Sequence, residues 1–324
     1  MNAPTQRALS LILLLSLALA SVAVIPGSPV AAASARQAAA QTLSLETLVA
    51  CQEAIEGVYW RHREWPDANL RAKPSLAEVL PRTALQARVL DTLRLSVALE
   101  DLWNRPITAV QLQAGMDRMA ADSSDPARLG ELFAALNNDP VLIAECLARP
   151  ALVSRLARNW YASDQRFHGD LHAQAAASLE GVSNDRALDS LGGQYIEIDI
   201  ARDSDPAAAS GGADWDTEVA RLAAIFDVAP DRLPVNQPSS LQEDADSFYA
   251  VTVLSQTAEH LAVATVSWQK TPFDRWWQDE SVNHSATAPG VAGAFRLPDL
   301  PAAPASADFW LPTQSLPERT DGTV

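Results

Sequence analysis

Three side chains late in the helical half of the chain have the types and spacing of a metal site. Asp164, His168 and His172 follow one another at intervals of four residues, which places them on one face of a helix. A carboxylate and two imidazoles are ligands that Zn²⁺ accepts. They form a candidate metal site, although no residue that would orient the imidazoles is apparent and a solvated polar helix face explains the same pattern.

Aromatic and methionine side chains offer a second chemistry, the binding of apolar polypeptide segments. The chain has nine tryptophans and three methionines, and such side chains line grooves that accept extended or helical peptides. Packing in the protein's own core explains the same residues, since large aromatic side chains are normally buried. The candidate peptide-binding residues are Trp60, Trp65, Trp103, Met116, Met119 and Trp160.

The two cysteines, Cys51 and Cys146, are candidates for a disulfide. The bond would close a loop of about 95 residues and would add roughly 4 kcal/mol to stability in an oxidising compartment. Two separately buried thiols are the alternative, because the sequence does not give the distance between them.

Motifs that carry catalysis are missing from the sequence. It contains no G-x-S-x-G nucleophile motif and no glycine-rich phosphate loop, and neither cysteine stands in a nucleophile motif. We therefore predict no catalytic residue and no cofactor.

Charge and the N-terminal segment limit the partners and the compartment. The net charge is −16 and the sequence pI is about 4.6, so the protein's field repels phosphate backbones and we predict no nucleic-acid partner. Residues 1–33 read as a signal peptide, with Arg7 as their only charge, an apolar run from Ala8 to Ile25 and small residues at the expected cleavage site. We expect export to the periplasm or the cell exterior. An uncleaved signal segment acting as an anchor is the alternative, and it would be the only contact with a membrane.

A mainly helical module over residues 43–182 would position most of these residues. A broad apolar stripe predicts a helix over 84–103, and another long helix is predicted over 152–179 after Arg149-Pro150 has broken or kinked the chain. Polar residues suited to capping precede the other expected helices, namely Ser44 or Thr42, Thr108, Asp125 and Asp139.

A small acidic domain over residues 189–283 follows, which gives an α+β fold overall. Within it we predict a strand at 195–200, a helix at 215–226 and an antiparallel hairpin of strands 248–254 and 261–268. A short aromatic helix at 272–277 is expected to seal one end of this sheet. Residues 284–324 are rich in proline and alanine and are predicted to form an irregular tail.

The helical module resembles the N-terminal domain of SurA-type periplasmic chaperones, which accompanies parvulin prolyl isomerase domains. The resemblance covers about residues 82–179 and rests on a long apolar helix, the helix start Pro106-Ile107-Thr108 and a helix ending in Arg118-Met119-Ala120. The phrases CQEAIEGVYWRHREWP, LEDLWNRPIT and RNWYASDQRFH are also similar to the N-terminal region of exported bacterial proteins, some of which continue into a kelch-like β-propeller.

The resemblance implies a non-catalytic, chaperone-like module that binds unfolded or extended polypeptide segments. Two alternatives stay open. The chain is either a divergent parvulin-type prolyl isomerase, for which His260 in the hairpin turn is the residue to test, or an accessory N-terminal region of a kelch-type propeller protein.

Overall fold

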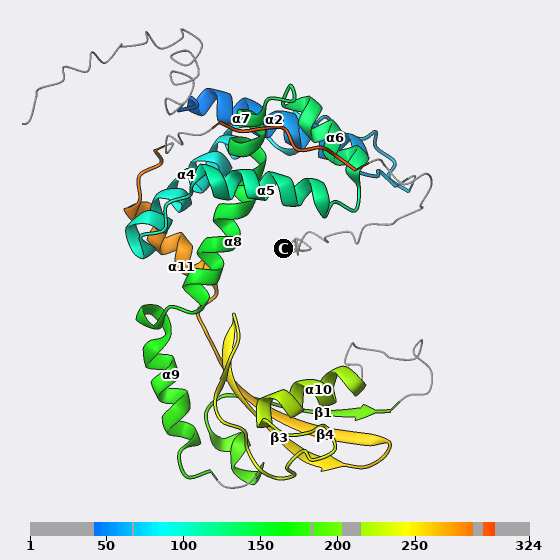
Figure 1. Ribbon diagram of the computed structural model, residues 1–324, viewed down its shortest axis with the longest axis vertical. Coiled ribbons are helices and arrows are strands. Elements are labelled where there is room, and N and C mark those ends of the chain that lie inside the picture. The colour runs from blue at the N-terminus through cyan, green and yellow to red at the C-terminus, as the bar shows by residue number, and fades with distance from the viewer. Residues whose placement is uncertain (1–41, 67, 183–184, 203–214, 288–293, 302–324) are drawn as a thin grey trace, which may run out of the picture. The chain divides into compact units, whose positions relative to one another are not determined.

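The computed structural model describes residues 42–301, except 67, 183–184, 203–214 and 288–293 (Figure 1). The predicted signal peptide at residues 1–33 and the part of the predicted tail after residue 301 lie outside the described residues. The predicted α+β fold class is confirmed, because a set of helices is joined to one small antiparallel sheet.

Capping residues set the starts of the helices as predicted. The Ser44 hydroxyl accepts a hydrogen bond from the Thr47 amide, and Thr108 forms a reciprocal capping box with Gln111. Asp125 accepts from the Arg128 amide. The first helices are α2 (Leu45–His62), α3 (Leu76–Val79), α4 (Arg82–Trp103), α5 (Ala109–Ala121) and α6 (Pro126–Ala135).

The Arg149-Pro150 pair widens a helix without breaking it. Helix α7 (Pro140–Ile143) continues through a π-helical turn (Ala144–Ala148) into α8 (Arg149–Ala162). Proline has no amide hydrogen for the usual bond to the carbonyl four residues earlier, and its ring crowds that carbonyl. A π turn accommodates this change in the bonding ladder. The sequence predicted either a break or a kink at this pair. In the structure the helix is instead continuous and is locally widened by the π-helical turn.

The long helix predicted over 152–179 is in fact two helices, and this prediction is wrong. Helix α8 ends at Ala162, and α9 (Gln165–Leu179) begins after Asp164, whose carboxylate accepts from the Arg166 amide. Asp164 is therefore the N-cap of a new helix, although its spacing from His168 and His172 suggested a position inside one.

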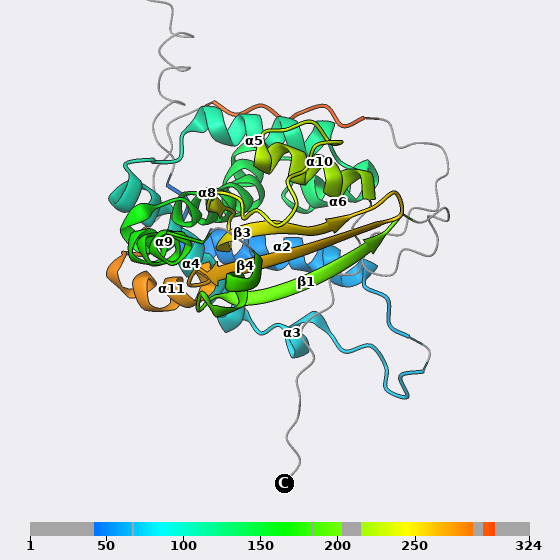
Figure 2. The ribbon, with the colours of Figure 1, turned by 90° about the horizontal axis from the view of Figure 1, so that it is seen from below.

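The sheet has the strand order β1-β4-β3-β2 and is antiparallel throughout. Alternation along the strands gives it two apolar faces: Val251 and Val263 face α10 (Trp215–Phe226), and Phe248 and Val266 belong to the cluster that includes Ala175 of α9. Figure 2 shows the three long strands side by side. The strands are β1 (Gln194–Ala201), β2 (Gln242–Glu243), β3 (Ser247–Gln256) and β4 (His260–Gln269).

The aromatic helix after the hairpin belongs to the helical core, so the prediction that it seals the sheet is wrong. In α11 (Phe273–Glu280), Phe273 and Trp277 are buried in the same cluster as α2, α4 and α8. The Trp277 indole N–H donates to Oδ1 of Asp91 in α4 at 2.8 Å. The chain therefore returns to the helical module after β4. None of the helices in the described part of the chain is long and apolar enough to cross a membrane.

Candidate functional site

Two adjoining hollows open on the helical module. The first, which we call the α4 hollow, lies between α2, α4 and the π turn and has a cavity volume of about 200 Å³. The second, the α6 hollow, lies between α2, α5, α6 and the start of α8 and has a cavity volume of about 550 Å³. Both are lined by Gln52, Cys146 and Pro150, so they adjoin at the π turn, and we call the two hollows together the depression.

The walls of this depression are mainly apolar. The α4 hollow is bounded by Leu48, Val89 and Leu93. The α6 hollow is bounded by Ile55, Met119, Leu129, Leu132 and Leu147, with Asp122, Ser123 and Ser124 at one side. Tyr59, which lines the α6 hollow, is 46% exposed. An apolar floor with a few polar groups is the usual composition of a ligand-binding surface.

A buried ion pair supplies two of the polar groups of the α4 hollow, which Gln52, Arg88 and Thr92 also line. Arg149 Nε lies 2.6 Å from Glu145 Oε2, and Nη2 lies 3.0 Å from Oε1, so the contact is bidentate. The Arg149 side chain is 2% exposed and that of Glu145 is 11% exposed. Each charge neutralises the other, and the hollow therefore presents no unpaired charge from this pair to an apolar ligand.

The two cysteine thiols contact each other beneath the depression. Cys51 on α2 and Cys146 on the π turn are both buried and reduced, and they share a hydrogen bond. That hydrogen bond lowers the pKa of Cys51, whereas the hydrogen bond together with burial raises the pKa of Cys146. The two thiols therefore lie near each other, and the disulfide stays a prediction.

Of the six side chains predicted to bind peptides, only Met119 lines the depression. Met116 is completely buried in the core. Trp60 and Trp65 hold the connector after α2, since their indole N–H groups donate to the carbonyls of Pro74 and Arg71, respectively. Both remain partly exposed, as a peptide-binding role requires, but they lie outside the two hollows.

Trp103 and Trp160 lie elsewhere on the module. The Trp103 ring is 6.1 Å from Trp276 and 6.4 Å from Phe167, measured between centroids, and belongs to an aromatic cluster at the α8–α9 corner. The guanidinium of Arg105 lies 4.8 Å from the centroid of Trp160. Both tryptophans are half-buried. Both side chains pack within the module at these places. The six residues that the sequence predicted as one peptide-binding group therefore lie apart in the structure.

The predicted metal ligands Asp164, His168 and His172 also have separate environments. The Asp164 carboxylate accepts from Arg166 and from the Trp103 indole, and these contacts, the Arg166 hydrogen bond foremost, lower its pKa to about 2. The buried His168 donates from Nε2 to the Tyr161 carbonyl at 3.0 Å. The His172 ring packs edge-on against Phe248. The described residues contain no cluster of three metal-ligating side chains, so the structure does not bring the three predicted ligands together; each contacts a different partner.

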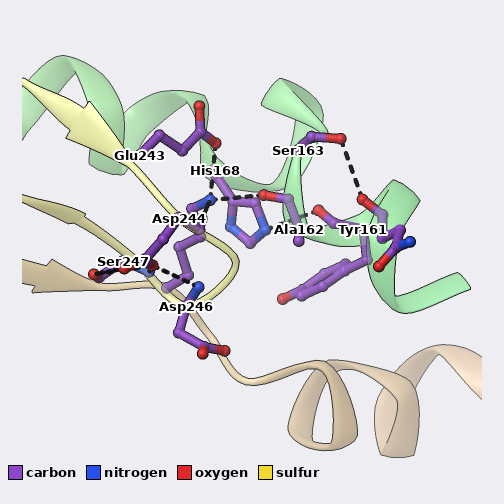
Figure 3. Close-up of polar contacts among 10 residues, drawn as sticks. Tyr161, Ala162, Ser163, His168, Glu243, Asp244, Asp246 and Ser247 are labelled. Carbon is purple, nitrogen blue, oxygen red and sulfur yellow. Dashed lines mark hydrogen bonds and ion pairs between the residues drawn. The ribbon is translucent and has the colours of Figure 1, made fainter. Parts of the chain in front are cut away.

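A buried lysine joins the α8–α9 corner to the sheet. Lys270 Nζ donates to the Ala162 carbonyl at 2.7 Å, to the Asp244 carbonyl at 2.7 Å and to Glu243 Oε1 at 2.8 Å. Figure 3 shows the corner residue Ala162 facing the turn between β2 and β3, with the His168 ring beside it. All three ammonium hydrogens have acceptors, which indicates a structural contact and leaves no donor for a substrate.

His260, the residue to test for isomerase activity, lies at the first position of β4. Its Nδ1 is 3.7 Å from Asp199 Oδ1 on β1, and both side chains are more than half exposed. The pair therefore stands on the surface of the sheet and outside the depression on the helical module.

Sequence reasoning missed Gln52, Tyr59, Glu145 and Arg149 as groups at the site. The Arg149-Pro150 dipeptide was the one available signal, because a proline inside an apolar helical pattern indicates an altered turn. Comparisons of the chain with protein-family models, with curated proteins and with solved structures find no match.

Proposed function

We propose that the protein is an exported, non-catalytic module that binds unfolded or extended polypeptide segments, similar in role to the N-terminal domain of SurA-type chaperones. The N-terminal sequence pattern supports export. The ligand is an apolar stretch of polypeptide that lies along α2 across both hollows.

The observation that carries this proposal is that the two hollows adjoin at the π turn. Gln52, Cys146 and Pro150 line both of them, and the lining residues on α2 run from Leu48 to Tyr59, so the two hollows together are elongated along that helix. A chain segment is the kind of ligand that fills such a shape with alternating side chains.

The composition of the walls supports an apolar ligand that keeps its backbone partly hydrated. Leucine, isoleucine and methionine side chains offer area that a client's apolar side chains can bury. Gln52 and the polar loop at Asp122 to Ser124 lie beside that area and can bond main-chain groups. A net charge of −16 keeps the protein soluble while it holds such ligands.

A binding titration with two matched variants tests the proposal. The probe is a fluorescently labelled protein that has been reduced and carboxymethylated so that it stays unfolded, and its anisotropy reports binding. Tyr59→Ser removes an exposed aromatic side chain from the α6 hollow, and Val110→Ser removes an exposed apolar side chain from α5 outside the hollows. We expect Tyr59→Ser to weaken binding about tenfold and Val110→Ser to leave it unchanged. Equal affinities for all three proteins would refute the site.

A prolyl-isomerisation assay separates the binding role from catalysis. Wild type and His260→Ala are compared on a proline-containing tetrapeptide. We expect no acceleration by either protein, because His260 and Asp199 are exposed on the sheet and do not enclose a substrate. Activity in the wild type that disappears in the variant would establish the isomerase alternative.

A further inference from the structure

The helical module already holds one extended polypeptide segment, and it is part of the same chain. Residues 294–301 run without regular structure along α5, as Figure 2 shows. The side-chain amide of Gln113 bonds the main chain of Arg296 in both directions. Its Oε1 accepts from the Arg296 amide at 3.0 Å, and its Nε2 donates to the Arg296 carbonyl at 3.2 Å. These two bonds require an extended backbone at that residue.

Side chains fix the segment on either side of this point. Arg296 Nη2 lies 3.1 Å from Asp117 Oδ2, and Gln113 Nε2 also donates to Asp117 Oδ1 at 2.8 Å, which orients the carboxylate. Phe295 and Leu300 pack against the helical core. The Leu300 Cδ1 atom is 3.4 Å from the position that a Cβ on Gly130 would occupy, so the glycine permits a close approach to α6.

These contacts define what the surface recognises. The side-chain amide of Gln113 bonds the main chain of the segment, so this contact does not depend on which side chain the bound residue carries. Asp117 selects a cation, and the neighbourhood of Gly130 accepts a leucine four positions later. Leu297, by contrast, is 41% exposed. The pattern is an apolar residue followed by arginine, then three positions that these contacts do not specify, and then leucine. In this chain a proline stands in the middle of the three unspecified positions.

We propose that this face of α5 and α6 is a binding surface for extended segments of other polypeptides that carry the same pattern, and that residues 294–301 occupy it as an exchangeable internal ligand. The ion pair that holds the segment is weak, because the Arg296 side chain is 76% exposed and that of Asp117 is 38% exposed. An equivalent segment at sufficient concentration therefore displaces the internal one.

The inference deepens the proposed function, on which it rests for the class of ligand, and it adds a second surface with a defined sequence preference. Met119 on α5 and Leu129 on α6 line the α6 hollow, and Gln113 and Gly130 belong to the same two helices. A client can therefore engage both surfaces through one pair of helices.

The test uses a fluorescein-labelled peptide with the sequence of residues 294–301, AFRLPDLP, titrated with the full chain. The double variant Phe295→Ser, Leu300→Ser removes the apolar anchors of the internal segment and leaves the receptor face intact. We expect its Kd for the peptide to be at least tenfold lower than that of the wild type. Leu297→Ser is the matched control and should behave like the wild type. Adding Gln113→Ala to the double variant should abolish the gain.

Further arms keep the result interpretable. Arg296→Ala, which alters an exposed side chain only, replaces the double variant if that protein melts early, and the same direction of change is expected. A double variant that binds no better than the wild type overturns the inference, as does a gain that survives Gln113→Ala. A wild-type dimer that the peptide dissociates would assign the face to a second copy of the chain and overturn the proposed partner. If the wild type exchanges the peptide but does not bind the unfolded protein, the proposal that the hollows bind unfolded chains is refuted and the inference about the α5–α6 face is not.

Discussion

The indole N–H of Trp103 donates a hydrogen bond to Oδ2 of Asp164, with 2.8 Å between the two heavy atoms. One of these residues was expected to face peptides and the other to hold a metal. In the structure each is the other's hydrogen-bond partner, because the end of α4 meets the N-terminus of α9 at this point. Their types suited both predicted roles, but their positions in the fold give them a structural one.

Asp164→Asn should lower the free energy of unfolding by about 1–2 kcal/mol, since the uncharged amide keeps the helix cap but loses the charge-assisted bonds to Arg166 and Trp103. The folded pKa of about 2 means that the wild-type carboxylate contributes stability above its unfolded pKa and loses that contribution as the pH falls toward 2. Urea unfolding at pH 7 measures the change, with Asp170→Asn on the exposed side of α9 as the control. Equal losses in the two variants would contradict the assignment.

Lys270→Met should cost about 2–4 kcal/mol, because it leaves two carbonyls and the Glu243 carboxylate without their donor in a buried contact. Arg275→Met, an exposed change on α11, should cost little. Hydrogen exchange gives a local readout: the variant should lose protection at the α8–α9 corner and in the β2–β3 turn together. Loss at only one of them would show that the lysine does not join the two.

His168 makes stability depend on pH. Burial, with the charge of Lys270 as a second cause, lowers the pKa of His168, and Glu243 and Asp164 oppose this shift only partly. Between the folded and unfolded pKa values the unfolded chain binds more protons, so the free energy of unfolding falls as the pH drops below about 6.5. Chemical denaturation from pH 8 to pH 5 should show this slope in the wild type, and His168→Gln should flatten it. The same slope in both proteins would assign the effect to other groups.

Cys51 and Cys146 should form a disulfide when the protein is treated with a small-molecule disulfide such as oxidised glutathione, since the two thiols lie near enough to shift each other's pKa. The bond would raise stability by roughly 4 kcal/mol for a loop of this length, and reduction should reverse the increase in melting temperature. Cys51→Ser should show no response to either treatment. Two titratable thiols and an unchanged melt after oxidation would rule the bond out.

Much of the fold was predictable because its determinants are local. Capping residues such as Ser44 and Thr108 predicted where helices start. Runs of residues with high β-propensity on either side of a polar turn predicted the β3–β4 hairpin. The break at Asp164 was missed, because an aspartate serves equally well on a helix face and at an N-cap. The packing of Trp277 on α4 depends on a contact with Asp91 that is 186 residues distant in sequence.

The candidate site was less predictable for the same reason. Its walls come from helices that are far apart in the chain, and Gln52 or Tyr59 has no local feature that marks it as a lining residue. Tryptophan content indicated a binding role but not a location, because the indoles serve the connector after α2 and the aromatic cluster near α9.

Site-specific photo-crosslinking on the α6 hollow tests whether an unfolded polypeptide binds there. A photoreactive phenylalanine analogue replaces Tyr59 in one protein and Val110 in another, both exposed positions of the helical module, and each is irradiated with the unfolded, carboxymethylated probe. We expect a covalent adduct from position 59 that excess unlabelled probe suppresses, and little or none from position 110. Equal labelling at the two positions, or labelling only at 110, would contradict it.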